Sequence, residues 1–330
     1  MNILFIIGNG FDLNLGMKTK YTDFYKYYQS IDSSSDSIIN LKKDISINLK
    51  NWSDLELALG KYTQNINSVK EFDLVFEDIG DNLCDFLLQT ESNFNFNKID
   101  KKKLFDYFSY PERLLLKSDK DKLSMFKRNW NNSNWNVNVI TFNYTRSIEK
   151  ILGEKPQNLQ IGSNNNYKII LQRIEHIHGY ANDRMVMGVN DISQIANTSF
   201  HTNQDILEAL VKNSCNQANK HGIDILCKQQ ISYANLICIF GSSIGDTDKM
   251  WWIEIGKQLL KGSSLIIFEL GEQISQRRGY LQARKERNIK EAFLNKTALT
   301  NEEKKKAEKN IYVGINTDMF NITIDNVSNL

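Results

Sequence analysis

The feature that most constrains the fold is a set of short apolar runs, each followed at once by glycine or polar residues. Residues 2–7 (NILFII) run into Gly8, and residues 234–240 (ANLICIF) run into a second glycine-bearing stretch. Runs of this length that are rich in Ile and Phe are typical of strands buried on both faces. The other predicted strands are residues 137–142, 168–177, 264–270 and, at an edge, 311–315. The sequence therefore predicts an α/β fold, Rossmann-like, with a mainly parallel sheet flanked by helices.

Helical spacing dominates between the predicted strands at residues 2–7 and 137–142. After a first strand and helix, residues 38–130 repeat apolar side chains three and four apart, as in Val75, Ile79 and Leu83. A crossover between parallel strands needs only about a dozen residues, so this stretch is predicted to be a large helical insertion that covers the sheet. Residues 154–167 are expected to form a loop. Residues 277–310 are expected to form a charged helical segment with a solvated face.

Composition excludes several classes of protein. The 41 Lys and Arg against 39 Asp and Glu give a formal charge of +2, which argues against nucleic acid as the main partner. No apolar stretch approaches the roughly 20 residues of a membrane span, and no leader is evident, so we expect a cytoplasmic protein without membrane contact. The four cysteines lack CxxC spacing and are expected to be reduced and half-buried rather than disulfide-bonded or zinc-binding.

Polar motifs follow four of the predicted strands. They are GNGFD at 8–12, NYT at 143–145, HGY at 178–180 and GSSIGDTD at 241–248. In open parallel sheets, ligands bind outside the carboxyl ends of the strands. The four segments are therefore expected to converge on one pocket.

The first motif suits a phosphate, although it fits neither standard nucleotide fingerprint. Gly8 and Gly10 would let main-chain amides approach a phosphate group. The Walker spacing is absent, and Leu13 occupies the third glycine position of the dehydrogenase fingerprint, which argues against an ATPase or a hydride-transfer enzyme. The alternative is a simple tight turn with Asp12 as a capping residue.

The third motif contains a candidate general base. His176 and His178 lie two apart, which places both on one face of a strand and imitates a metal pair. No further cluster of His and Cys supplies more ligands. A histidine suits general-base catalysis because its ordinary pKa lies near physiological pH, and His178, next to Gly179, is preferred.

Other polar residues have simpler interpretations. Asn143 could fix a ribose hydroxyl or a carboxamide, or it could only form a turn. Asp246 and Asp248 are expected to cap the next helix. Asp54 and Glu56 lie two apart on a helix and are expected to point in different directions, so they are not predicted to be a catalytic pair.

With these segments in view, the chain resembles the AbiH family of bacteriophage abortive infection proteins. The opening IIGNGFDLNLGMKTKYTDF is similar to the start of that family. NWSDLE, ITFNYT, HIHG with MVMGVND, and IFGSSIGDTDKMWW follow in the family's order. The resemblance spans most of the chain and implies a role in phage defence.

The chain also resembles, more distantly, sirtuin-like NAD-consuming domains, which implies one such domain over residues 1–330. Those domains have a glycine-rich loop after the first strand, an Asn in a strand-end TxN motif and a His followed by Gly. The resemblance implies that Asn143 and His178 are catalytic and stand near the nicotinamide ribose. The residues that it implies for nucleotide binding are Gly8, Asn9, Gly10, Phe11, Asp12, Thr141, Tyr144, Gly241, Ser242, Ser243 and Asp246.

Two positions depart from these patterns. Thr145 stands where sirtuin-like motifs often have Asp, and Ser242 stands where AbiH relatives often have His. The scattered cysteines have no counterpart to the zinc ribbon of deacetylating sirtuins, which disfavours a deacetylase.

The resulting hypothesis is an NAD glycohydrolase that needs no cofactor and takes NAD as substrate. The alternative is a non-catalytic sensor of NAD or ADP-ribose that engages a phage-derived trigger or partner protein. A metal-dependent nuclease built on His176, His178 and Asp246 is the least favoured possibility. A homo-oligomer is compatible with each hypothesis.

Overall fold

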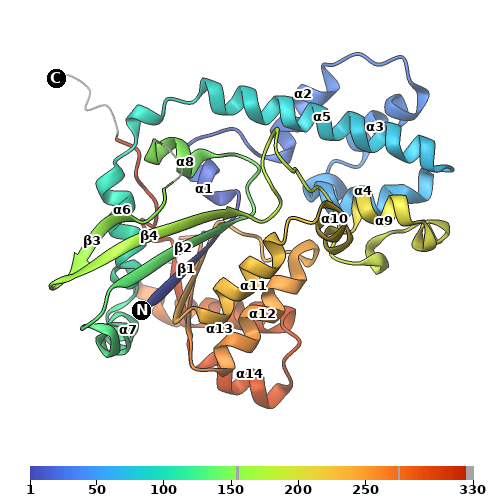
Figure 1. Cartoon of the computed structure of the whole chain (residues 1–330). Coiled ribbons are helices and arrows are strands. Elements are labelled where there is room, and N and C mark those ends of the chain that lie inside the picture. Colours follow the sequence, from blue (N-terminus) through green and yellow to red (C-terminus); the bar gives the residue numbers. More distant parts are fainter. Residues whose placement is uncertain (154–155, 274–275, 325–330) are drawn as a thin grey trace.

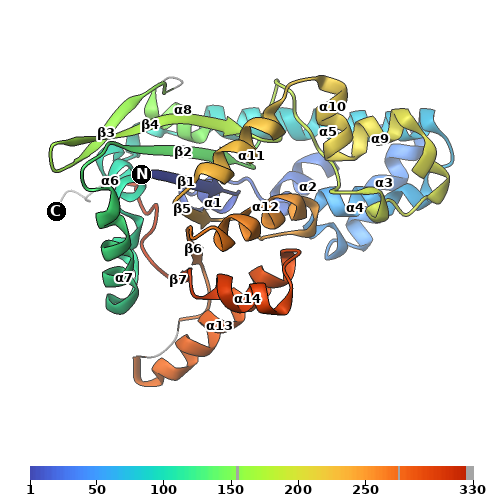
Figure 2. The same cartoon turned by 60° about the horizontal axis from the view of Figure 1, so that its bottom comes forward.

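Seven strands form one sheet in the computed structural model of the chain, which describes residues 1–153, 156–273 and 276–324. Their order across the sheet is β3-β4-β2-β1-β5-β6-β7, of which Figure 1 labels β1 to β4 and Figure 2 also labels β5 to β7. The strands are β1 (Asn2–Ile7), β2 (Trp135–Thr141), β3 (Leu159–Asn164), β4 (Tyr167–His176), β5 (Leu236–Phe240), β6 (Ser264–Glu269) and β7 (Ile311–Ile315). The prediction of an α/β chain with a helix-flanked sheet is confirmed.

The strands that carry the four polar motifs run in one direction. β1 pairs in parallel with β2 on one side and with β5 on the other, and β4 pairs in parallel with β2. β6 and β7 continue the sheet in parallel beyond β5. The carboxyl ends of β1, β2, β4 and β5 therefore lie at the same edge of the sheet.

β3 corrects the expected loop at residues 154–167. Residues 154–155 lie outside the described residues, but Leu159–Asn164 pairs antiparallel with β4 as an edge strand. Within it only Ile161 is buried, because an edge strand lies half in solvent and needs little apolar surface. The segment therefore has neither the apolar run nor the alternation by which a strand is recognised.

Helices fill the chain between β1 and β2. They are α1 (Gly10–Asn14), α2 (Tyr21–Gln29), α3 (Asp36–Ile47), α4 (Leu55–Tyr62), α5 (Val69–Asn93), α6 (Lys101–Ser109) and α7 (Lys117–Lys127). Ser68 caps the N-terminus of α5, because its side chain accepts from the amide of Glu71, and the helix buries Val75, Ile79 and Leu83 as their spacing predicts. The helical character of residues 38–130 agrees with the sequence, and their role as an insertion stays a prediction.

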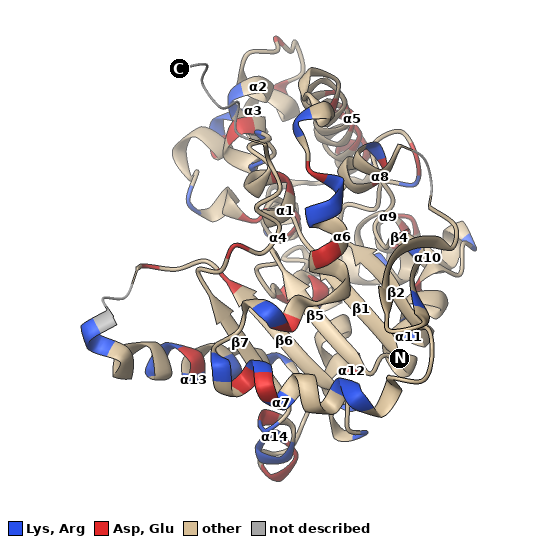
Figure 3. Ribbon diagram, turned by 90° about the vertical axis from the view of Figure 1, so that its left-hand side faces the viewer, with Lys and Arg blue, Asp and Glu red and all other residues tan. Residues whose placement is uncertain are grey.

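The remaining helices are α8 (Ser147–Leu152), α9 (Gln204–Leu210), α10 (Lys212–Asn219), α11 (Ile223–Tyr233), α12 (Lys249–Leu260), α13 (Gly279–Lys296) and α14 (Asn301–Glu308). The charged segment predicted at 277–310 is thus two helices. Figure 2 shows α13 extending from the rest of the chain, and Figure 3 shows both signs of charge along it. Its last turn is not solvated, since Phe293 and Leu294 are buried.

The sheet separates two cores. Side chains alternate along β1, so Ile3 and Phe5 pack with α6 on one face, whereas Leu4 and Ile6 pack with α11 and α12 on the other. Trp252 of α12 is fully buried in the second core, and burying a large apolar side chain contributes about 1.5–3 kcal/mol. A third cluster lies among α2 to α5 and α9.

The cysteines and the membrane prediction need only brief comment. Cys84, Cys215, Cys227 and Cys238 are free, and all but Cys84 are buried. Within the described part of the chain, no helix has the length and apolar character to cross a membrane.

Candidate functional site

The four polar motifs meet at one cavity of about 750 Å³ at the carboxyl edge of the sheet. The segments between β1 and β2 form its opposite wall, through Tyr21, Ser53, Asp54, Glu56, Leu57 and Leu83. The expected convergence of the motifs is confirmed. Of the residues predicted to bind or act, the cavity is lined by Gly8, Asn9, Gly10, Asp12, Asn143, Tyr144, His178, Gly241, Ser242, Ser243 and Asp246.

Two predicted residues do not line the cavity. The ring of Phe11 points into the core below, where its centroid lies 5.2 Å from that of Phe320. Thr141 is buried at the end of β2, and its hydroxyl accepts from the amide of Asn143 at 3.1 Å. Phe11 therefore packs in the hydrophobic core, and Thr141 stabilises the turn in which Asn143 lies.

The glycines of the first motif serve backbone packing. A Cβ on Gly8 would lie 2.6 Å from the carbonyl oxygen of Gly241, and a Cβ on Gly10 would lie 2.4 Å from the Cα of Gly241. Gly241 itself has φ of +68°. Only glycine allows the loops after β1 and β5 to approach this closely.

The main-chain amides of this loop correct the phosphate interpretation. The amide of Gly8 donates to Phe240 at 2.9 Å, that of Gly10 to Gly241 at 2.8 Å, and that of Phe11 to Gly8 at 3.0 Å. Three of the four amides at residues 8–11 are thus already engaged within the chain. These three amides are therefore not free to donate hydrogen bonds to a diphosphate.

Asn143 stands at the cavity with an unsatisfied side chain. It is 7% exposed, and its Oδ1 is buried with no hydrogen-bond partner. Its own carbonyl oxygen lies 3.0 Å from Nδ1 of His176, which fixes the backbone. Buried polar atoms without a partner are rare in proteins, and one beside a cavity is typical of a site that a ligand or water completes.

Asp12 lies at the same place in a similar state. It is fully buried, its Oδ2 accepts from the hydroxyl of Thr145, and its Oδ1 has no partner. Burial raises the pKa of Asp12 to about 6, although nearby hydroxyl groups partly offset that effect. A carboxyl group with a perturbed pKa beside a cavity is a candidate functional group.

The ring of His178 contacts the ring of Phe142 and the carboxylate of Asp248. Its ring stacks on Phe142 with centroids 5.4 Å apart, and it is 4% exposed. Its Nε2 lies 3.1 Å from Oδ1 of Asp248, within ion-pair distance although at an angle outside hydrogen-bond geometry. The pair places a carboxylate behind the imidazole, as in a base and the group that orients it.

Asp248 corrects the capping prediction. It stands at the N-terminus of α12, but its side chain makes no capping hydrogen bond there. Burial alone would raise the pKa of Asp248, but the charges of Lys212 and His178 outweigh burial and hold it well below its ordinary value. Asp246 pairs at 2.7 Å with Lys296 at the rim and does not cap the helix either.

Glu56 and Lys212 were not predicted as functional residues. Nζ of Lys212 lies 2.8 Å from Oε2 of Glu56 and 2.8 Å from Oδ1 of Asp248. Asp54 caps α4 by accepting from the amide of Leu57, yet it lines the same cavity as Glu56. Both carboxylates thus line one cavity but have different partners, and the expectation that they point in different directions and are not a catalytic pair stays a prediction. Lys212 gives no sequence signal, because its partners are 156 and 36 positions away.

His176 is not placed to share a metal ion with His178. Its Nε2 lies 2.7 Å from Oε1 of Glu149, and its Nδ1 faces the carbonyl oxygen of Asn143. Both ring nitrogens are thus engaged by the chain. No group of three or more His, Cys, Asp and Glu residues arranged for a metal occurs among the described residues.

The charge of the main cavity is mostly negative. Asp12, Asp54, Glu56, Asp246 and Asp248 line it, against the ammonium groups of Lys20 and Lys296. Such a lining favours a ligand that carries positive charge or hydroxyl donors at its buried end.

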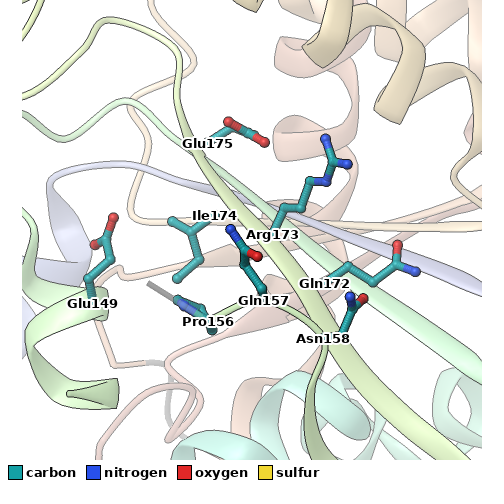
Figure 4. A pocket seen from close by; sticks show the side chains of 8 residues that line it. All are labelled: Glu149, Pro156, Gln157, Asn158, Gln172, Arg173, Ile174 and Glu175. Atoms are coloured by element: carbon teal, nitrogen blue, oxygen red, sulfur yellow. The ribbon is translucent and has the colours of Figure 1, made fainter. Parts of the chain in front are cut away.

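A second hollow of about 510 Å³ lies beside β4 and α8, away from the four motifs (Figure 4). Polar side chains of both elements line it, among them Gln172, Arg173 and Glu149. It has neither Asn143 nor His178, and we assign the site to the larger cavity.

Comparison with known families gives one match that covers most of the chain. A profile of the family described as bacteriophage abortive infection AbiH matches residues 4–269. That range includes each segment that lines the main cavity except Lys296. No curated protein matches the chain.

Proposed function

The chain belongs to the bacteriophage abortive infection AbiH family, and from that membership we propose that it acts in anti-phage defence by hydrolysing NAD to nicotinamide and ADP-ribose. Loss of the cell's NAD would stop phage replication in the infected cell. NAD is the substrate in this proposal, and no further cofactor is required.

The observation that carries the proposal is the meeting of Asn143, His178 and Asp12 at one cavity. Two of these residues have buried oxygens without partners, and both oxygens accept hydrogen bonds. A ribose offers hydroxyl donors to such acceptors. The volume of about 750 Å³ falls within the range of small-molecule sites.

Each side chain has a defined task in the proposed reaction. Asn143 orients the ribose, and Asp12, when ionised, stabilises the positive charge that develops on the sugar as the glycosidic bond lengthens. Water attacks C1′ of the ribose. The C1′–N bond breaks, its electron pair stays with nicotinamide, which leaves neutral, and His178 accepts the proton from water.

The acidic lining supports the nicotinamide end of the substrate more than the diphosphate. The nicotinamide ring of NAD is positively charged, so carboxylates beside it stabilise the bound substrate. The amides at residues 8–11 are mostly engaged and Lys296 is paired with Asp246, so we assign the diphosphate to Lys20.

The test is a nicotinamide-release assay on the purified chain and on extracts of infected cells that express it. His178→Ala is expected to lower the rate by about 10²- to 10⁴-fold, as loss of a positioned base does, and Asn143→Ala is also expected to lose activity. His221→Ala, at an exposed loop residue, is the matched control and should retain the rate. Circular dichroism checks that each variant is folded.

Absence of nicotinamide release from the wild type in both settings would refute hydrolysis. One observation favours a non-catalytic sensor in that case, namely Thr145, where sirtuin-like motifs have Asp. Calorimetry that detects binding of NAD or ADP-ribose, with the ligand unchanged after long incubation, would support the sensor.

A further inference from the structure

We propose that Lys212 is a positioning residue of this site, which holds Glu56 and Asp248 as a buried pair of carboxylates and shares the charge of Asp248, so that Asp248 orients His178 while His178 stays free to accept a proton. This inference rests on the proposed function, because it gives His178 the role of the base. Lys212 and Glu56 lie outside the four motifs, whereas Asp248 and His178 belong to them.

The geometry is a continuous chain of contacts. Nζ of Lys212 lies 2.8 Å from Oε2 of Glu56 and 2.8 Å from Oδ1 of Asp248. The other oxygen of Glu56 accepts from the hydroxyl of Tyr144 at 2.6 Å, and Oδ1 of Asp248 lies 3.1 Å from Nε2 of His178. The ring centroids of Tyr144 and His178 are 6.3 Å apart, so the first and last residues of this series of contacts lie beside each other.

Lys212 reaches the site from outside the cavity. It is 2% exposed at the start of α10 and is not among the residues that line the cavity. Its ammonium group links the first turn of α4 with the start of α12, which come from distant parts of the chain. A change at this residue therefore acts on a ligand through the two carboxylates.

The charges around Asp248 explain why a cation is needed. Asp54 and Glu56 face the same region as Asp248, and Lys212 and His178 are the basic groups that act on it. Burial lowers the pKa of Lys212, but the two paired carboxylates reverse that effect and raise it above its ordinary value. Lys212 therefore stays charged, and of these two basic groups Asp248 would keep only His178 without it.

The sign of the effect on proton uptake follows directly. Removal of a positive charge makes proton uptake by neighbouring groups easier. Nζ of Lys212 and Nε2 of His178 contact the same oxygen, so the effect on the His178–Asp248 pair is direct. The base is then protonated over a wider range of pH, and less of it is free to accept a proton.

The experiment compares Lys212→Met and Lys212→Arg with the wild type by the pH dependence of kcat and KM for NAD. In Lys212→Met the acidic limb of kcat is expected to move to higher pH by about one unit or more, with kcat lowered far more than KM is raised. Lys212→Arg, which keeps the charge, is expected to return the limb toward the wild-type position. A limb that stays in place in a folded Lys212→Met variant would overturn the proposal.

A double variant and an NMR titration distinguish failure of this proposal from failure of the variant to fold and from failure of the proposed function. If Lys212→Met does not fold, Glu56→Gln/Lys212→Met removes one of the stranded carboxylates, and the same shift is expected relative to Glu56→Gln alone. NMR titration of the His178 ring, assigned with His178→Asn, follows proton uptake without turnover. An unchanged titration midpoint in the lysine variant would refute the role of Lys212 even if the chain released no nicotinamide. A raised midpoint without nicotinamide release would refute only the hydrolase.

Discussion

Asp12→Asn is expected to stabilise the chain at neutral pH while it impairs the site. Asp12 is fully buried, burial outweighs its favourable interaction with His176, and one of its oxygens makes no hydrogen bond. A carboxylate in such a place is costly to keep ionised. Asparagine has nearly the same shape and carries no charge, so it removes that cost.

The magnitude follows from linkage between protonation and folding. Burial raises the pKa of Asp12 from 3.8 to about 6, so the folded chain binds this proton more tightly than the unfolded chain does. The carboxyl group thus costs nothing well below pH 3.8, and its cost grows until the pH passes about 6. At 1.36 kcal/mol for each pKa unit, the full cost is about 3 kcal/mol.

Urea unfolding of the wild type and Asp12→Asn at pH 4 and pH 7 measures this cost. The free energy of unfolding of the variant, relative to that of the wild type, is expected to rise by most of that amount between the two pH values. Asp121→Asn, at an exposed ion pair, is the control and should show a difference below about 0.5 kcal/mol at both.

A variant whose relative stability is the same at pH 4 and pH 7 would refute the raised pKa. A variant that loses stability as the pH rises would show that Asp12 gains more from its surroundings when it is ionised. In either case burial would not raise the pKa of Asp12, and a perturbed pKa would no longer mark it as a candidate functional group.

Two further substitutions test the packing. Gly10→Ala is expected to destabilise the chain by about 2 kcal/mol or more in urea unfolding, because its Cβ would lie 2.4 Å from facing backbone, whereas exposed Gly279→Ala should change little. Comparable stability of the two variants would show that the loops separate easily. Lys127→Met is expected to lower the free energy of unfolding by about 3–5 kcal/mol, because it leaves the buried carboxylate of Glu112, 2.7 Å from Nζ of Lys127, without this cation. Lys117→Met, at an exposed lysine, is the control. A loss as small as that of the control would show that water reaches Glu112.

The sequence determined the parts of the structure that depend on local periodicity. The apolar runs at β1, β5 and β6 are strands because each must be buried on both faces, and the stripe along α5 is buried because apolar residues recur three and four apart. The position of the polar motifs after four strands also indicated the edge at which they meet.

Tertiary structure alone decided how those segments work together. The close contact of Gly8 and Gly10 with Gly241 exists only because β1 and β5 are neighbours in the sheet, and the same contact engages the amides that the sequence assigned to a phosphate. Glu56 and Lys212, 156 residues apart, meet because separate helices pack over one strand edge. Periodicity reports which face of an element is buried, but electrostatic pairing depends on three-dimensional distance, and that distance is fixed only when the elements have packed.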